Sequence, residues 1–235
     1  MDSHNFFQVN RSELKYEMHP LDALCLQNEL DLLLTRDHYS SSGSYMVRSL
    51  YFDSLNDIDF TEKYAGTKCR RKIRVRIYDT NAQNGKLELK QKDGGYSQKK
   101  SLLITRDEIA MLINGNYSFL LDYETATAIE LYTILSLGYY RPKAIIEYQR
   151  TAFTYPENRT RITFDYSLKC SEIDLDLFST ALPWFPVTNE KVILEVKYNE
   201  QLVRIISDVL KKYMLTQVSV SKYTAGRPIY AKYIL

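Results

Sequence analysis

The sequence has few of the residues that cross-link a chain or ligate zinc. Its 235 residues include only three cysteines and three histidines, and both kinds are widely separated. An odd number of scattered cysteines does not build a disulfide framework and is typical of a reducing compartment. The histidines are too dispersed for a zinc site or a catalytic triad. These absences argue against a secreted disulfide scaffold and against a zinc enzyme.

Long apolar runs and glycine-rich nucleotide motifs are also absent. No stretch approaches the roughly 20 residues that cross a bilayer, and residues 1–18 lack the apolar core of a secretory signal. We therefore expect a cytoplasmic protein with no transmembrane segment of its own. Neither the P-loop spacing nor the Rossmann glycine pattern occurs, so a nucleotide would have to bind by other means.

The net charge is small but unevenly distributed. The chain has 31 basic and 29 acidic residues and a formal charge of +2. Residues 70–100 nevertheless hold ten basic and three acidic residues, a net of +7, whereas residues 1–40 and 101–140 are acidic. The total therefore hides a strongly basic middle, which is either a solvated face or a surface for an anion.

Alternation of polar and apolar residues predicts β-strands. In residues 70–78, β-branched residues at positions 73, 75 and 77 alternate with basic ones. This period of two is typical of a half-buried strand. A turn-like segment leads from it to residues 86–92, so we expect a hairpin. Similar patterns predict strands at residues 11–17, 47–53, 143–153, 159–165 and 191–198.

Helices are expected between these strands, at about residues 20–35, 105–113, 122–137 and 200–213. Pro20 suits the first position of a helix, and Thr105 with Glu108 forms a capping-box pattern. Gly138 is typical of a helix end. Because no interdomain linker is evident, we expect a single α+β domain over residues 1–235.

Several of the predicted strands carry positive charge on one face. These residues include Lys15, Arg74, Arg76, Lys90, Lys92, Arg150, Arg161, Lys197 and Lys222. Such faces either cover the outside of a sheet or line a closed antiparallel β-barrel tunnel with a basic polar lumen. The amphipathic helices favour the tunnel, because they could cover its apolar outer face. An unpaired buried charge costs several kcal/mol, so a basic lumen would need water, carboxylates or a bound polyanion.

Eight short segments then point to a family. They are RSELKY (11–16), SLYFD (49–53), KIRVRIY (72–78), LELK (87–90), YQRTAF (148–153), RITFD (161–165), LEVKY (194–198) and SKY (221–223). In this order they resemble the VTC (vacuolar transporter chaperone) catalytic domain family, the polyphosphate polymerase domain of the triphosphate tunnel metalloenzyme (CYTH-like) superfamily. The resemblance covers about residues 10–226. It implies a tunnel in which the γ-phosphoryl group of ATP extends a polyphosphate chain, with Mn²⁺ or Mg²⁺ as cofactor.

The resemblance also implies roles for individual residues. Arg74, Arg76 and Lys90 would be catalytic, with the two arginines clamping the transferred phosphoryl group. Glu195 would hold the metal ion. Further phosphate or ATP contacts would come from Lys15, Lys99 or Lys100, Tyr148, Arg150, Arg161, Ser221 and Lys222. Lys197 shares the strand face of Glu195, so it is either an additional contact or a partner that neutralises Glu195 or Glu88.

Two positions depart from the family pattern. Arg11 replaces the first carboxylate of the E-x-E-x-K signature, and Ser101 stands where relatives often have another base. A two-metal hydrolase would need more carboxylates, so the first departure favours a polymerase over a triphosphatase or a cyclase. The pairs Glu88–Lys90 and Glu195–Lys197 could instead be structural ion pairs with no ligand.

The expected function is therefore an ATP-dependent polyphosphate polymerase. A hydrolase of triphosphate or polyphosphate, or a non-catalytic polyphosphate-binding module, would use the same residues. We expect no nucleic-acid partner, because the basic strands lack the interleaved aromatic residues of single-strand binders. The family resemblance also implies a membrane protein partner and a peripheral location at the membrane.

Overall fold

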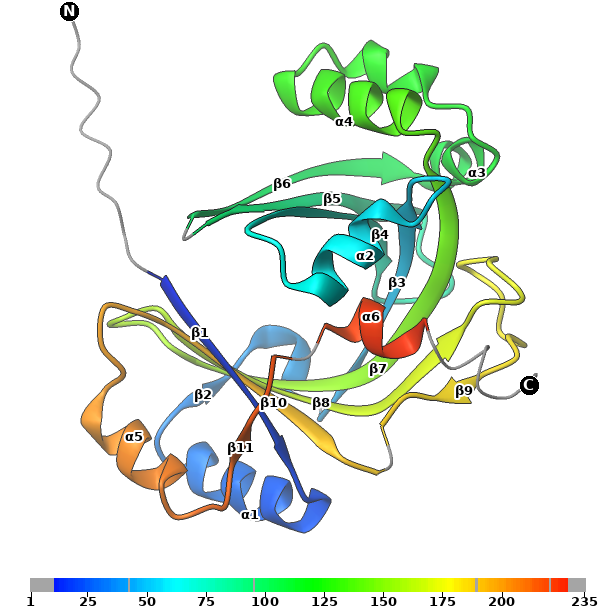
Figure 1. Cartoon of the computed structure of the whole chain (residues 1–235). Helices are drawn as coiled ribbons and strands as arrows, with labels where there is room; N and C mark the ends of the chain where they lie inside the picture. The colour runs from blue at the N-terminus through cyan, green and yellow to red at the C-terminus, as the bar shows by residue number, and fades with distance from the viewer. Residues whose placement is uncertain (1–10, 42, 95, 189, 220, 228–235) are drawn as a thin grey trace, which may run out of the picture. The chain divides into compact units, whose positions relative to one another are not determined.

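The computed structural model describes residues 11–41, 43–94, 96–188, 190–219 and 221–227 (Figure 1). Its strands are β1 (Arg11–Met18), β2 (Thr35–Arg36), β3 (Tyr45–Asp53), β4 (Cys69–Ile77), β5 (Asn84–Asp93), β6 (Tyr96–Thr105), β7 (Arg141–Tyr155), β8 (Thr160–Ser171), β9 (Phe185–Pro186), β10 (Val192–Asn199) and β11 (Thr216–Gln217). Its helices are α1 (Pro20–Asp31), α2 (Ile58–Ala65), α3 (Arg106–Ile113), α4 (Ala126–Leu137), α5 (Arg204–Leu210) and α6 (Lys222–Gly226), with 3-10 helices η1 (His38–Ser40) and η2 (Ser118–Tyr123). The α+β class is confirmed.

The strands hydrogen-bond in the order β11-β1-β10-β8-β7-β3-β4-β5-β6, with β2 beside β7 and β9 beside β8. The prediction of a closed barrel is wrong for the described residues, because this order does not return from β6 to β11. A barrel closes only where its two end strands can pair along a matching length. Here one end strand has ten residues and the other has two.

Residue contacts divide the chain into two compact units. Unit 1 comprises Met1–Tyr45, Gln149–Ser167 and Thr188–Val220, and unit 2 comprises Met46–Tyr148, Leu168–Val187 and Ser221–Leu235. Strands β7 and β8 each contribute residues to both units. The single domain over residues 1–235 stays a prediction.

In unit 1, helices α1 and α5 cover the apolar face of β1, β10 and β8. Leu26 of α1 and Ile206 of α5 are fully buried against strand residues such as Phe164 and Leu194. The helix predicted over residues 20–35 begins at Pro20 as expected, and the one predicted over 200–213 is shorter, Arg204–Leu210. Burial of these side chains removes apolar surface from water, which is the main stabilising term of such a core.

In unit 2, α3, η2 and α4 cover the apolar face of β4, β5 and β6 (Figure 1). Ile73, Val75 and Ile77 of β4 point into this core and are at most 1% exposed. The predicted alternation is therefore confirmed, and the basic residues between them lie on the opposite face. In register, Val75 is opposite Leu87 of β5, so the predicted hairpin is confirmed as well.

The predicted capping box is present at the start of α3. The Thr105 hydroxyl accepts the Glu108 amide at 3.3 Å, and the Glu108 carboxylate accepts the Thr105 amide at 2.7 Å. Helix α4 begins at Ala126, later than predicted, because the Thr125 hydroxyl caps it by accepting the Ala128 amide at 3.2 Å. Strand β6 is not among the strands that the sequence patterns predict. Gly94, with φ of +54°, allows a tight turn between β5 and β6.

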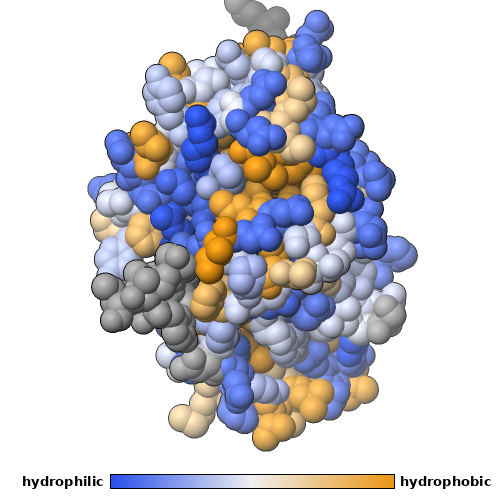
Figure 2. All heavy atoms as spheres, turned by 90° about the vertical axis from the view of Figure 1, so that its right-hand side faces the viewer, coloured by the Kyte–Doolittle hydropathy of each residue, from blue (hydrophilic) through white to orange (hydrophobic). Residues whose placement is uncertain are grey.

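Exposed apolar side chains are mixed with polar ones on the surface that Figure 2 shows. Over the described residues as a whole, the large apolar side chains with the highest exposed fractions include Met214 at 94% and Leu32 at 86%. No helix within the described ranges is long and apolar enough to cross a membrane.

Candidate functional site

The polar face of the β3–β6 sheet in unit 2, here called the basic face, carries most of the positive charge of residues 70–100. Because side chains alternate along a strand, the register assigns the residues of this face. They include Ser49 and Tyr51 of β3, Lys72, Arg74 and Arg76 of β4, Lys86, Glu88, Lys90 and Lys92 of β5, and Lys99 and Ser101 of β6.

Basic residues stand opposite one another across the basic face. Lys72 is in register with Lys90, and Lys90 with Lys99. Like charges directly opposite on neighbouring strands destabilise a sheet. A row of three lysines therefore has a cost in the free energy of folding that a bound anion would offset.

Glu88 is the acidic centre of the basic face. Its carboxylate, only 3% exposed, accepts a hydrogen bond from Arg74 Nε at 2.7 Å, lies 3.9 Å from Arg76 Nη1 and pairs with Lys99. Burial raises the pKa of Glu88, but the Coulombic attraction of the two arginines and the Lys99 hydrogen bond outweigh burial and lower this pKa to about 2. The carboxylate is thus ionised at neutral pH and holds three cations together.

Arg74 is fixed on two sides. Its Nε donates to Glu88 and its Nη1 donates to the Tyr51 hydroxyl at 2.9 Å. An arginine has five N–H hydrogens. Within the described residues Arg74 forms no other hydrogen bond, so three N–H groups remain for a ligand, and the side chain is 24% exposed. This geometry suits the two-point recognition of a phosphate.

Helix α6 and strand β7 bring further candidate residues to unit 2. The Ser221 hydroxyl accepts a hydrogen bond from Lys72, and the Lys222 ammonium lies 4.9 Å from the centre of the Tyr148 ring. Tyr148 and Ser221 are almost fully buried. Unit 2 therefore contains Arg74, Arg76, Lys90, Lys99, Tyr148, Ser221 and Lys222 of the residues predicted from the sequence.

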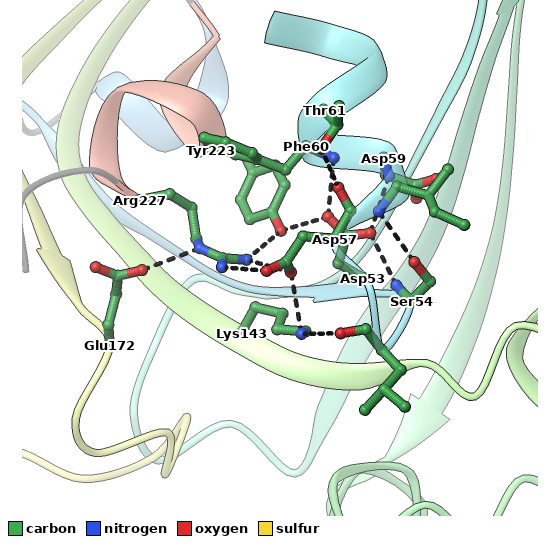
Figure 3. Close-up of polar contacts among 12 residues, drawn as sticks. Asp53, Ser54, Asp57, Asp59, Phe60, Thr61, Lys143, Glu172, Tyr223 and Arg227 are labelled. Atoms are coloured by element: carbon green, nitrogen blue, oxygen red, sulfur yellow. Dashed lines mark hydrogen bonds and ion pairs between the residues drawn. The ribbon is translucent and has the colours of Figure 1, made fainter. Parts of the chain in front are cut away.

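A polar network holds α6 against the start of α2 (Figure 3). Arg227 donates to both carboxylate oxygens of Asp57 at 2.8 Å and pairs with Glu172 at 3.0 Å. The Tyr223 hydroxyl donates to Asp53 at 2.7 Å. Asp53 also accepts the backbone amides of residues 59 and 60, which an N-terminal helix turn leaves unpaired. One buried carboxylate thus fixes two helices.

The structure separates the two lysines between which the sequence could not choose. Lys99 lies on the basic face and pairs with Glu88. Lys100 lies opposite Leu89, on the other face of the sheet, and its ammonium pairs with Glu130 of α4. Lys100 is therefore not part of the basic face.

The remaining candidates lie in unit 1, on the polar side of β1, β10, β8 and the unit 1 part of β7. Lys15 pairs with Glu13 at 3.0 Å, and Lys197 pairs with Glu195 at 2.5 Å. The structural ion pair that the sequence left open for Glu195 is thus present. In register, Lys15 is opposite Glu195.

Two arginines of unit 1 are also held by carboxylates. Arg150 binds Asp165 through two hydrogen bonds of 2.6 and 2.8 Å, and Arg161 Nη2 donates to Asp37 at 2.6 Å. The Thr163 hydroxyl, in register with Glu195, is buried with no hydrogen-bond partner among the described residues. This face is more evenly balanced in charge than the basic face of unit 2.

The donors present fit a cation that arrives with a phosphate rather than a resident metal ion. Within the ranges that the structure describes, no three His, Cys, Asp or Glu side chains are grouped to hold a metal. Glu195 offers carboxylate oxygens beside the unpartnered Thr163 hydroxyl. Mg²⁺ is commonly held by one or two carboxylates together with phosphate oxygens, which matches this set.

Sequence reasoning missed several residues of these faces. Tyr51 and Tyr223 were not selected, because tyrosine is common in this chain and was assigned to packing. Lys72 has the same parity as Arg74 and Arg76, and this signal could have identified it. The carboxylate partners Asp37 and Asp165 carry no local signal, since they meet their arginines only through the fold.

Comparison with solved structures identifies the class of fold. HpAC1 from Hippeastrum, an adenylyl cyclase candidate with a dominant triphosphatase activity, matches with a TM-score of 0.56 and 13% identity, over 95% of this chain and 96% of that chain. An adenylate cyclase candidate from Bacillus halodurans matches with a TM-score of 0.53 and 11% identity, over 90% and 95%. The chain shares the fold of these two proteins.

The sequence profile of the VTC domain matches residues 10–230. The chain therefore belongs to the VTC domain family, as its eight ordered segments predicted. No curated protein sequence matches it.

Proposed function

We propose that this protein is an ATP-dependent polyphosphate polymerase that binds phosphates on its basic face. The observation that supports this most directly is Arg74, which Glu88 and Tyr51 orient while three of its N–H groups stay available. Membership of the VTC domain family supports the same class of ligand.

Phosphoryl transfer needs positioning and charge neutralisation more than covalent help from the protein. In the proposed reaction Arg74 and Arg76 bind the equatorial oxygens of the transferred group. Lys90 and Lys99 position the donor or the chain, and Glu88 keeps the cations in place before the substrate arrives. Within unit 2, additional contacts would come from Tyr148, Ser221 and Lys222. The phosphate contacts of Lys15, Arg150, Arg161 and Lys197 in unit 1 stay predictions from the family resemblance.

A divalent cation, Mn²⁺ or Mg²⁺, would neutralise phosphate charge when bound. We assign it to Glu195, with the Thr163 hydroxyl as a second oxygen donor. Lys197, paired with Glu195 at 2.5 Å, would have to give up part of this contact. The predicted membrane partner and cytoplasmic location stay predictions.

A hydrolase of triphosphate or polyphosphate is the second candidate. The dominant triphosphatase activity of HpAC1, which shares the fold, favours it. The basic face would bind the same substrate in both cases, because the two reactions differ in the acceptor, a phosphate chain or water.

The test is to incubate the purified chain with ATP and Mn²⁺ and to measure long-chain polyphosphate and free phosphate. Long chains support the polymerase, and free phosphate alone supports the hydrolase. Absence of both products would overturn the enzymatic proposal and leave a binding module, provided that tripolyphosphate still binds.

Arg74→Ala tests the site itself. We expect at least a roughly tenfold loss of tripolyphosphate affinity, the effect of removing a charged hydrogen-bond donor. The melting temperature should fall by less than on removal of the Glu88 charge itself, because Glu88 keeps Arg76 and Lys99 as partners. Arg141→Ala is the control, since Arg141 also donates to a tyrosine hydroxyl at 2.9 Å, that of Tyr117, away from the basic face. Equal effects of the two substitutions would contradict the assignment.

A further inference from the structure

Tyr51 occupies an unusual position for a buried tyrosine. It is 4% exposed, and its hydroxyl accepts the Arg74 Nη1 hydrogen bond at 2.9 Å. No residue among those described accepts the hydrogen of this hydroxyl. The Arg74 guanidinium also lies 5.7 Å from the centre of the Tyr51 ring. The Tyr51 oxygen thus forms a hydrogen bond with Arg74, and the Tyr51 ring lies within cation–π range of the same guanidinium.

The other side of the ring is equally constrained. Tyr223 of α6 stacks on Tyr51 with ring centres 5.0 Å apart and an angle of 16° between the planes. The Tyr223 hydroxyl donates to Asp53 and accepts from Arg227 at 2.9 Å (Figure 3). A continuous set of contacts therefore runs from Arg227 through the two stacked rings to Arg74.

We propose that Tyr51 is a positioning residue that fixes the Arg74 guanidinium for phosphate and couples it to the seating of α6. This inference rests on the proposed binding of phosphate by Arg74. A guanidinium held only by Glu88 could rotate about its Nε contact. The second hydrogen bond, to Tyr51, fixes the plane of the fork, and planarity is what makes its recognition of phosphate specific.

The charges around Tyr51 predict a pH dependence of binding that tests this role. The charged and titratable groups that act on it are Arg74 and Arg76 of β4 and Lys222 and Tyr223 of α6. Asp53, Glu88 and Tyr148 act on these neighbours, Asp53 on Tyr223 and the other two on Arg74. Burial raises the pKa of Tyr51, but the attraction of the arginines and the lysine outweighs burial and lowers this pKa below its usual value.

Ionised Tyr51 would place a negative charge against Arg74. The affinity for a polyanion should therefore fall as the pH rises through the pKa of Tyr51. In Tyr51→Phe this component of the pH dependence should be missing, while the titration of the lysines contributes to both proteins alike. A merely structural tyrosine would leave the pH profile unchanged.

The experiment measures tripolyphosphate affinity by calorimetry between neutral pH and pH 10 for the wild type, Tyr51→Phe and Tyr117→Phe. The last is a matched control, because Tyr117 is buried in unit 2 and its hydroxyl also accepts an arginine Nη1 at 2.9 Å. We expect Tyr51→Phe to lower the affinity at neutral pH by roughly two- to tenfold, the effect of one net hydrogen bond. We expect a flatter alkaline profile for this variant and no change for the control.

The inference would be overturned if Tyr51→Phe kept the affinity and the pH profile of the wild type. It would also be overturned if Tyr51→Phe and Tyr117→Phe lost the same amount of tripolyphosphate affinity. Arg74→Ala, measured in parallel, separates this failure from that of the proposed function. If Arg74→Ala binds tripolyphosphate like the wild type, the proposed site is wrong. If it binds weakly while Tyr51→Phe is unaffected, only the role of Tyr51 is wrong.

Discussion

Removing the charge of Glu88 should destabilise the protein strongly at neutral pH. Glu88→Gln keeps the volume of the side chain but leaves Arg74, Arg76 and Lys99 without their shared carboxylate. The pKa of Glu88 falls from 4.5 in the unfolded reference to about 2 in the folded protein. Because each pKa unit corresponds to about 1.4 kcal/mol, the ionised carboxylate contributes about 3 kcal/mol to the free energy of unfolding.

The pH dependence gives this prediction its direction. The folded-state pKa lies below the unfolded one, so the contribution is complete above about pH 5 and is lost as the pH falls toward 2. At pH 7 the variant should unfold about 3 kcal/mol more easily, which for a chain of this length lowers the melting temperature by about 6–12 °C. Near pH 3 only about half of the difference should remain.

Urea denaturation at pH 7 and pH 3 measures both values. Glu130→Gln is the control, because its ion pair with Lys100 is 28% exposed on each side and should contribute less than about 1 kcal/mol. The reasoning would be refuted by a difference for Glu88→Gln no larger than the control's, or by one that does not depend on pH. Tripolyphosphate should stabilise Glu88→Gln more than the wild type, since it replaces the missing negative charge.

Two further predictions concern the basic face and the first turn of α2. Lys99→Ala should weaken tripolyphosphate binding in a calorimetric titration, whereas Lys100→Ala should not, because only Lys99 lies on the basic face; the opposite ranking would contradict the assigned faces. Burial and the neighbouring Asp53 raise the pKa of Asp59 from 3.8 to about 7, so the wild type loses stability as the pH rises between these values. Asp59→Asn lacks this loss and should gain on the order of 4 kcal/mol relative to the wild type between pH 4 and pH 8. Urea unfolding of both proteins at pH 4 and pH 8 measures this gain. If the difference in the free energy of unfolding between the two proteins is the same at both pH values, Asp59 does not titrate in this range.

The sequence was sufficient to predict strand faces and a helix start where the pattern that indicates them is local. The alternation around Val75 correctly placed the basic side chains of β4 on one face and its apolar ones in the core. The Thr105–Glu108 pattern located the start of α3. In both cases the signal is local, since each residue is read against neighbours within a few positions.

Features that depend on distant partners could not be predicted. Strand β6 follows a glycine turn in a polar segment whose alternation is weak, so the sequence patterns do not predict it. The choice between Lys99 and Lys100 required the register against β5. Tyr51 acquires its role only because α6, some 170 residues later, places Tyr223 against its ring.

Gly226 gives the seating of α6 a consequence for related sequences. A Cβ atom at this position would lie 2.5 Å from Ile146 Cδ1 and 3.0 Å from Cys170 Sγ. Even alanine would therefore force the Ile146 side chain or α6 itself to shift, and a shift of α6 would carry Lys222 and Tyr223 with it. A glycine four residues after the lysine of the SKY segment is thus a sequence marker. A relative that keeps every basic residue but replaces this glycine would have to hold the helix that corresponds to α6 in another way.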